Sequence, residues 1–156
     1  MPLPVIISDV GQLTMVAQLS VQIQDEVQKL VKIFWPGPLS LVVPARAQVS
    51  TLLSGGTGNI ALRVSLHPVA RQLAQLLAEP IVSSSANISG HAPVTHVDEL
   101  HPELVKNTDV LNLPPTPQGG LPSTLVEPLG PNLIKIHRPG FVTEAALTSA
   151  GFTLAQ

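Results

Sequence analysis

Hydrophobic positions along the chain follow two periods in turn, one typical of strands and one typical of helices. Short apolar runs predict strands at residues 4–8, 39–43, 59–64, 80–83, 109–113, 123–127 and 133–137. Apolar residues three and four apart predict helices over residues 12–19, 23–34, 68–77 and 95–106, and from residue 143 onward. We expect Ser20 to cap the second helix and the Pro-Gly-Pro run at 36–38 to end it.

The order of these elements favours an α/β fold. Helices alternate with strands in the first two thirds of the chain, which is typical of parallel strands joined by crossover connections. Consecutive strands near the end favour antiparallel pairs. The 156 residues are enough for one sizeable core and too few for two domains of ordinary size. We therefore predict a single domain built on a twisted sheet, mixed parallel and antiparallel, with flanking helices.

Composition and charge exclude several classes of function. Eight lysines and arginines are scattered against ten acidic residues, so no basic block predicts binding to a nucleic-acid backbone by charge alone. The chain has no cysteine, and its five histidines lack metal-ligand spacing, so we expect neither a disulfide nor a structural metal. The apolar runs fall far short of the roughly 20 residues that cross a bilayer. We expect a cytoplasmic protein with no membrane partner.

A run of small polar residues follows the strand predicted at 80–83. Residues 83–87 read Ser-Ser-Ser-Ala-Asn. Short hydroxyls and an amide at the carboxyl end of a strand can donate hydrogen bonds to phosphate oxygens. A helix cap or an Asx turn is the alternative, because serine and asparagine make both routinely. A serine nucleophile is not expected, since the run lacks the G-x-S-x-G pattern.

Two arginines occupy positions where a guanidinium group needs an anionic partner. Arg63 lies inside an apolar strand, so either a ligand or a buried structural ion pair must offset its desolvation. Arg138 ends a strand and could reach the same sheet edge as the serine run, or be a solvated loop arginine. The glycines at 55–58 lack the lysine of a phosphate-binding P-loop. We interpret the arginines and serines as parts of one anion pocket.

Five motifs occur in order along the chain. They are FWPGPLSL at 34–41, ALRV at 61–64 with His-Pro at 67–68, SANISG at 85–90, PSTLV at 122–126 and RPG at 138–140. Together these motifs resemble the YrdC-like family, whose enzymes are threonylcarbamoyl-AMP synthases. The resemblance covers nearly the whole chain, from residue 2 to residue 152. It implies a twisted α/β fold with a large cleft.

The resemblance also implies an adenylation reaction and its ligands. L-threonine and bicarbonate would form a carbamate whose carboxylate attacks the α-phosphate of ATP, so that pyrophosphate leaves and threonylcarbamoyl-AMP remains. Mg²⁺ is expected on the ATP phosphates. A partner transferase would pass the threonylcarbamoyl group to an adenosine in certain transfer RNAs. Whether this chain touches RNA directly is left open.

Residue roles follow from the positions that match the family's motifs. The resemblance implies nucleotide contacts for Asn59, Ser85, Asn87 and Arg138. It implies contacts to threonine for Arg63, Ser83 and Ser123. The family usually has threonine where this chain has Asn59. No residue is assigned a covalent role or a metal, because adenylation of a carboxylate depends on positioning and charge neutralisation.

The chain departs from the family at its start. It begins after a strand and helix that, in the family, carry a Pro-Thr-x-Thr-like segment and a Lys-x-Arg-Pro segment. We therefore expect an N-terminally truncated YrdC-like domain over residues 1–156. An uncovered sheet edge and helix face favour self-association or a partner that fills the gap. A catalytically inactive paralogue that binds nucleotide or RNA, and a scaffold subunit, are the alternatives to a synthase.

Overall fold

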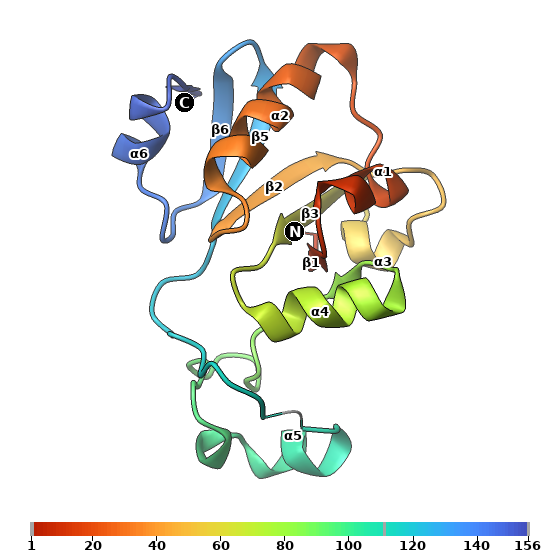
Figure 1. The fold of residues 1–156 in the computed structure, drawn as a ribbon, viewed down its shortest axis with the longest axis vertical. Helices are drawn as coiled ribbons and strands as arrows, with labels where there is room; N and C mark the ends of the chain where they lie inside the picture. The colour runs from red at the N-terminus through yellow and green to blue at the C-terminus, as the bar shows by residue number, and fades with distance from the viewer. Residues whose placement is uncertain (1, 111, 156) are drawn as a thin grey trace.

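A computed structural model describes residues 2–110 and 112–155. Its centre is a seven-stranded sheet in the order β4-β1-β3-β2-β5-β6-β7 (Figure 1). The strands are β1 (Pro4–Ile7), β2 (Leu39–Pro44), β3 (Asn59–Val64), β4 (Ile81–Val82), β5 (Thr124–Gly130), β6 (Leu133–Arg138) and β7 (Thr153–Leu154). The helices are α1 (Leu13–Val16), α2 (Val21–Phe34), α3 (Thr51–Ser54), α4 (Pro68–Leu77), α5 (Pro102–Asn107) and α6 (Glu144–Ser149), with 3-10 turns η1 (Val10–Gln12) and η2 (Val97–Glu99).

The sheet contains both kinds of strand pairing. The parallel pairs are β1 with β3, β2 with β5, and β6 with β7. The antiparallel pairs are β1 with β4, β2 with β3, and β5 with β6. Only two residues separate β5 from β6, which form the hairpin that the consecutive predicted strands favoured. The mixed α/β sheet predicted from the order of elements is confirmed.

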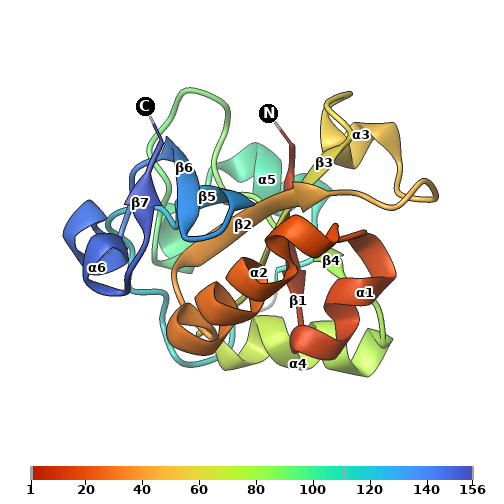
Figure 2. The same ribbon diagram turned by 90° about the horizontal axis from the view of Figure 1, so that it is seen from above.

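Helix α2 covers one face of the sheet with the apolar side that its sequence predicts. Val27, Leu30 and Val31 are buried in one cluster with the inward residues of the strands. Ser20 occupies the N-cap position, although its side chain makes no capping hydrogen bond. Figure 2 shows α1, α2 and α4 on the same side of the sheet. Among the described residues, no helix combines the length and the apolar character needed to cross a membrane.

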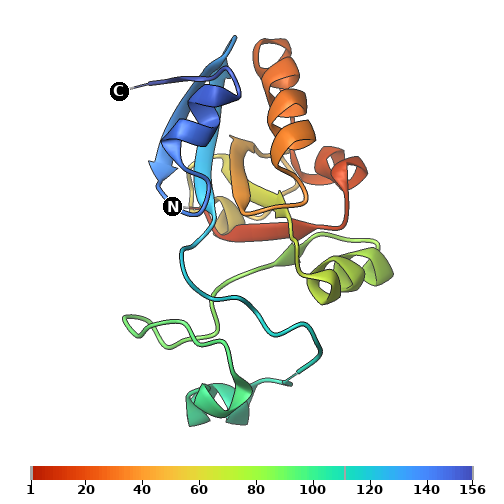
Figure 3. The same cartoon turned by 60° about the vertical axis from the view of Figure 1, so that its left-hand side comes forward.

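The opposite face of the sheet carries a much smaller apolar core. Because strand residues alternate between the two faces, Leu39 and Leu41 join the main core while Ser40 lies on the other side. The buried apolar cluster of this second face consists of Val42, Ala61 and Leu125. The buried residues of α2 belong to the main core on the other face, and Figures 2 and 3 show α2 to one side of the sheet. The helix layer that contains α2 therefore does not cover the polar side chains on this second face.

Residues 84–121, called the crossover segment below, leave the sheet after β4 and return to it at β5. The segment protrudes from the sheet, with α5 at its far end (Figures 1 and 3). Within the described chain, one hydrogen bond joins it to the rest, from the His67 ring nitrogen Nε2 to the Pro115 carbonyl at 2.7 Å. The segment is therefore attached mainly through its two ends.

The helix predicted over residues 95–106 is interrupted in the structure. It is divided into η2 and α5. Proline disfavours helical backbone at the residue before it, and His101, which precedes Pro102, is extended with φ −60° and ψ 134°. The prediction of one continuous helix is therefore wrong, and the two prolines at 102 and 93 limit regular structure in this part of the chain.

The strand predicted over residues 109–113 is also wrong. Its described residues have no partner in the sheet, and Leu111 lies outside the described residues. The run leads directly into Pro114 and Pro115, which have no N–H to donate to a neighbouring strand. Apolar alternation alone could not reveal this. The same kind of short-range pattern also missed α3 and β7, and it extended the first helix beyond Val16, where α1 ends.

The packing of α2 gives a direct test of the fold. Leu30 is 0% exposed, whereas Ile33 on the same helix is 50% exposed. We expect Leu30→Ala to lower the free energy of unfolding by about 2–5 kcal/mol, because it leaves a cavity in the main core. The matched change Ile33→Ala should cost less than about 1 kcal/mol. Urea denaturation followed by circular dichroism measures both, and equal losses would contradict the described orientation of α2.

Candidate functional site

Strand register brings both predicted arginines to the face of the sheet opposite α2. Leu125 in β5 pairs with Ser40 on one side and with Arg138 on the other. Continuing the β2–β3 register by one pair places Ser40 beside Arg63. Residues directly opposite each other on neighbouring strands share a face. Arg63 and Arg138 therefore lie on the same face, on either side of strands β2 and β5.

A cavity of about 420 Å³ opens beside this row of residues. Arg63, Ser65 and His67 line it from the end of β3 and the turn that follows. Ser123 and Phe141 line it from the ends of β5 and β6, and the last part of the crossover segment completes the wall. A concave site with a few convergent polar groups and a charged residue is typical of small-molecule binding.

Close packing between two turns fixes the backbone around Arg138. The N–H of Phe141 donates to the carbonyl of Pro122 at 2.9 Å. A Cβ at Gly140 would collide with that same carbonyl oxygen, so the approach requires a glycine. The Arg-Pro-Gly motif thereby places Arg138 directly over the segment that carries Ser123.

Arg138 is held in place without being neutralised. Its Nη2 donates to the Ser123 carbonyl oxygen at 2.9 Å and to Ser123 Oγ at 3.2 Å. Its Nε is buried and has no hydrogen-bond partner. Ser123 Oγ also lies 2.9 Å from Ser40 Oγ, and Ser40 is 1% exposed. The contacts orient the guanidinium group, while its charge remains available to an anion.

Arg63 likewise has no acidic partner in the described part of the chain. Its Nη1 is 3.5 Å from Ser65 Oγ, which is a weak contact. Burial lowers the pKa of Arg63, and the positive charge of Arg138 lowers that pKa further. The ion pair found among the described residues joins His137 to Glu127. The structural ion pair considered for Arg63 is therefore not seen. Arg63 lines the first cavity, and Arg138 is hydrogen-bonded to Ser123, which lines the same cavity.

A second cavity, of about 450 Å³, adjoins the first. His67 and Pro117 line both cavities, so the two spaces meet there. Ser84 and Ser85 line the second cavity, together with apolar residues of the crossover segment such as Leu104. The predicted serine run and Arg63 thus line neighbouring cavities rather than one common pocket, and Arg138 lines neither cavity.

Asn59 and Ser83 line neither cavity but lie near the same sheet face. Asn59 begins β3, four residues before Arg63. Because strand residues alternate between the two faces, Asn59 and Arg63 lie on the same face. The N–H of Ser83 donates to the Pro4 carbonyl at 2.7 Å, so Ser83 continues β4 by one residue.

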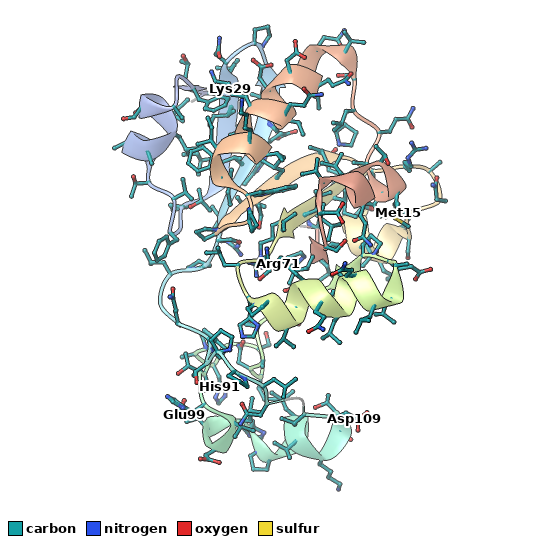
Figure 4. The ribbon with its side chains drawn as sticks, viewed as in Figure 1. Met15, Lys29, Arg71, His91, Glu99 and Asp109 are labelled. Atoms are coloured by element: carbon teal, nitrogen blue, oxygen red, sulfur yellow. The ribbon has the colours of Figure 1, made fainter. Side chains whose placement is uncertain are left out.

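Asn87 braces the serine loop from within. Its Nδ2 donates to the carbonyls of Ile88 and His91, at 3.1 and 2.8 Å. Its Oδ1 is buried and has no hydrogen-bond partner. Figure 4 shows His91 on the crossover segment, well below α4. Asn87 therefore shapes the loop, and its contact to nucleotide stays a prediction.

Three residues of the site were not assigned from the sequence. Ser40, Ser65 and His67 all lie within or beside the first cavity, and Ser40 and Ser65 are buried. A signal existed for Ser40, because it is a polar residue between two leucines of an otherwise apolar strand. Its meaning depends on the register with β5, which the sequence does not state.

A protein-family comparison identifies the class of protein to which this fold and site belong. The family model named for Sua5, YciO and YrdC, described as "Telomere recombination", matches residues 1–140. The chain belongs to this family, and the resemblance noted from its motifs is confirmed.

Several relatives of this chain are named threonylcarbamoyl-AMP synthase. The one from Serratia proteamaculans is 47% identical over 66 residues, which make up 42% of this chain and 35% of that protein. The one from Idiomarina loihiensis is 38% identical over 95 residues, 61% of this chain and 51% of that protein. The matched stretches thus span about half or less of the length of these relatives.

Solved structures of the family share the fold. P. abyssi Sua5 complexed with L-threonine is 27% identical with a TM-score of 0.83, over 99% of this chain and 45% of that one. A variant of P. abyssi Sua5 is 28% identical with a TM-score of 0.86, over 99% of this chain and 47% of that one. E. coli YciO, 19% identical with a TM-score of 0.69 over 89% of this chain and 66% of that one, shows the fold alone.

The unpaired charge of Arg63 should lower the stability of the ligand-free protein while favouring the binding of an anion. We expect Arg63→Gln to raise the melting temperature of the ligand-free protein by about 2–4 °C, the shift that about 1 kcal/mol produces in a chain of this size. The physical reason is that glutamine removes both the desolvated charge and its repulsion by Arg138. Differential scanning calorimetry measures the shift.

Arg71→Gln is the matched control. Arg71 lies on α4 (Figure 4) and lines neither cavity, so its replacement should leave the melting temperature nearly unchanged. A lower melting temperature for Arg63→Gln than for the unmodified protein would show that Arg63 has a stabilising partner after all. Sodium sulfate should stabilise the unmodified protein more than Arg63→Gln at matched ionic strength.

Proposed function

We propose that this chain acts as a threonylcarbamoyl-AMP synthase, forming the mixed anhydride of threonyl carbamate and AMP over the open face of the sheet. The observation that carries the proposal is the pair of guanidinium groups on one face of the sheet, neither paired with a carboxylate among the described residues. Arg63 lines the first cavity, and Arg138 is hydrogen-bonded to Ser123 in its wall. All the substrates that would meet there are anionic or carry a carboxylate. The synthase relatives and the threonine complex of P. abyssi Sua5 support the choice of substrates.

The chemistry consists of two bond-forming steps. The amino nitrogen of L-threonine attacks the carbon of bicarbonate, and water leaves, which gives the carbamate. A carbamate oxygen then attacks the α-phosphorus of ATP, and the bond from that phosphorus to the bridging oxygen breaks. Pyrophosphate departs with the electron pair. Neither step forms a bond to the protein, so the protein contributes by holding the reactants together and by neutralising charge.

The residues divide between the two substrates by their place on the sheet face. In this proposal Arg63, Ser83 and Ser123 contact the threonyl carbamate. Asn59, Ser85, Asn87 and Arg138 contact the nucleotide. Arg138 is hydrogen-bonded to Ser123, and in this proposal it lies between the carbamate and the α-phosphate. A cation at that point would stabilise the negative charge that develops on the phosphorus oxygens during attack.

Magnesium and macromolecular partners complete the proposal. The described residues contain no group of three His, Asp or Glu side chains that could hold a metal. We propose that Mg²⁺ binds the ATP phosphates and keeps most of its ligands as water, which suits its coordination chemistry. A transferase that acts on transfer RNA would consume the product. Direct contact of this chain with RNA, and self-association through a sheet edge left uncovered by the missing N-terminal segment, remain predictions.

Release of pyrophosphate tests the proposed reaction. We expect pyrophosphate to form from ATP only when both L-threonine and bicarbonate are present. Arg138→Ala and Arg63→Ala should each lower kcat/KM by about 100-fold or more, the usual effect of removing a group that stabilises developing charge. Arg71→Ala serves as the control and should retain full activity, because Arg71 lines neither cavity.

The same experiment separates the synthase from the inactive paralogue. ATP binding by isothermal titration calorimetry with no threonine-dependent release of pyrophosphate would favour a nucleotide-binding protein without synthase activity. Loss of ATP binding in Arg138→Ala would still place the nucleotide on this face. Release of pyrophosphate that does not depend on threonine would contradict the proposed reaction.

A further inference from the structure

We propose that Ser40 is a positioning residue that fixes the direction of the Ser123 hydroxyl, so that this hydroxyl donates its hydrogen into the first cavity. The inference rests on the proposed function for the name of the ligand and on the geometry alone for the orientation of Ser123. Ser40 itself is 1% exposed and lies beneath Ser123. It acts through Ser123 rather than by contact with a ligand.

Hydrogen-bond counting around Ser123 sets the direction. A serine hydroxyl has one hydrogen to donate and two lone pairs that accept. Arg138 Nη2, 3.2 Å from Ser123 Oγ, can only donate, so it occupies one lone pair. Ser40 Oγ, 2.9 Å away, is the other polar neighbour, and the distance alone allows either oxygen to be the donor.

Burial of Ser40 decides between the two directions. Ser123 Oγ is the one hydrogen-bond partner that the described chain gives to Ser40 Oγ. If Ser123 were the donor, the Ser40 hydrogen would be buried without an acceptor, which costs about 1–3 kcal/mol. Ser40 therefore donates, and it fills the second lone pair of Ser123. The hydrogen of Ser123 is then left over, and Ser123 lines the first cavity.

The Ser123 hydroxyl, when fixed in this direction, favours ligand groups that accept a hydrogen bond. It requires an acceptor, such as a carboxylate or phosphoryl oxygen, and it offers no lone pair to an ammonium group. Arg63 and Arg138 impose the same preference by charge. The geometry thus orients a bound amino acid with its carboxylate, or the carboxylate of its carbamate, toward Ser123.

Affinity for L-threonine, measured by isothermal titration calorimetry, tests the coupling between the two serines. Ser40→Ala should weaken binding about five- to tenfold, because Ser123 is then free to turn its hydrogen away from the ligand. Ser40→Thr keeps the hydroxyl and should bind within about twofold of the unmodified protein. Ser54→Ala is the matched control, since Ser54 is 4% exposed and donates to a helix carbonyl in α3, outside both cavities.

A double-mutant cycle separates positioning from general packing. If Ser40 acts through Ser123, the double variant Ser40→Ala/Ser123→Ala should bind threonine no more weakly than Ser123→Ala alone. Additive losses, or unchanged affinity in Ser40→Ala, would overturn the inference while leaving the proposed function in place. Melting temperatures of all variants confirm that each one is folded.

A measurement without ligand keeps the inference testable if threonine does not bind at all. Absence of threonine binding by the unmodified protein would contradict the proposed function. The nitrogen-15 NMR signals of the Arg138 side chain report on the same hydrogen bonds in the free protein. Ser40→Ala should shift these signals, while Ser54→Ala should not. An unshifted Arg138 signal in Ser40→Ala would overturn the role of Ser40 whatever the substrate is.

Discussion

Two positive charges on one face of a sheet are the constraint on which the rest of the site depends. Arg63 and Arg138 repel each other, and burial lowers the pKa of Arg63. The strands that carry the two arginines are anchored on their other face by the core beneath α2. The hydrogen bonds from Arg138 to Ser123 prevent the side chain from escaping to solvent. An anion between the two groups would remove the repulsion that the folded chain maintains.

Much of the fold could be predicted from the sequence, because the strongest signals are periodic. The apolar side of α2 and the alternation in β2 are buried as their patterns indicate. The two wrong elements lie where proline overrides the pattern, at residues 95–106 and 109–113. Local periodicity reports which side of an element is apolar and says nothing of which strand lies beside it. The strand order β4-β1-β3-β2-β5-β6-β7 is set by contacts between distant segments.

The sequence predicted several residues of the candidate site, but it predicted their arrangement in space less well. Motif order identified the family and picked out Arg63, Ser123 and Arg138, which the structure brings to neighbouring positions. It could not separate the serine run from the arginine cavity, because that separation comes from the path of the crossover segment. Nor could it reveal Ser40, whose role arises from a register with β5.

The crossover segment has a practical consequence for how this protein is studied. It forms a large part of the walls of both cavities, yet a single described hydrogen bond, from His67 to Pro115, ties it to the body. Its displacement would deform the cavities and leave the sheet and α2 intact. Far-ultraviolet circular dichroism and thermal melting report mainly on the sheet and helices, so neither method detects displacement of the crossover segment. Limited proteolysis between β4 and β5 detects it, because a displaced segment is cleaved more readily.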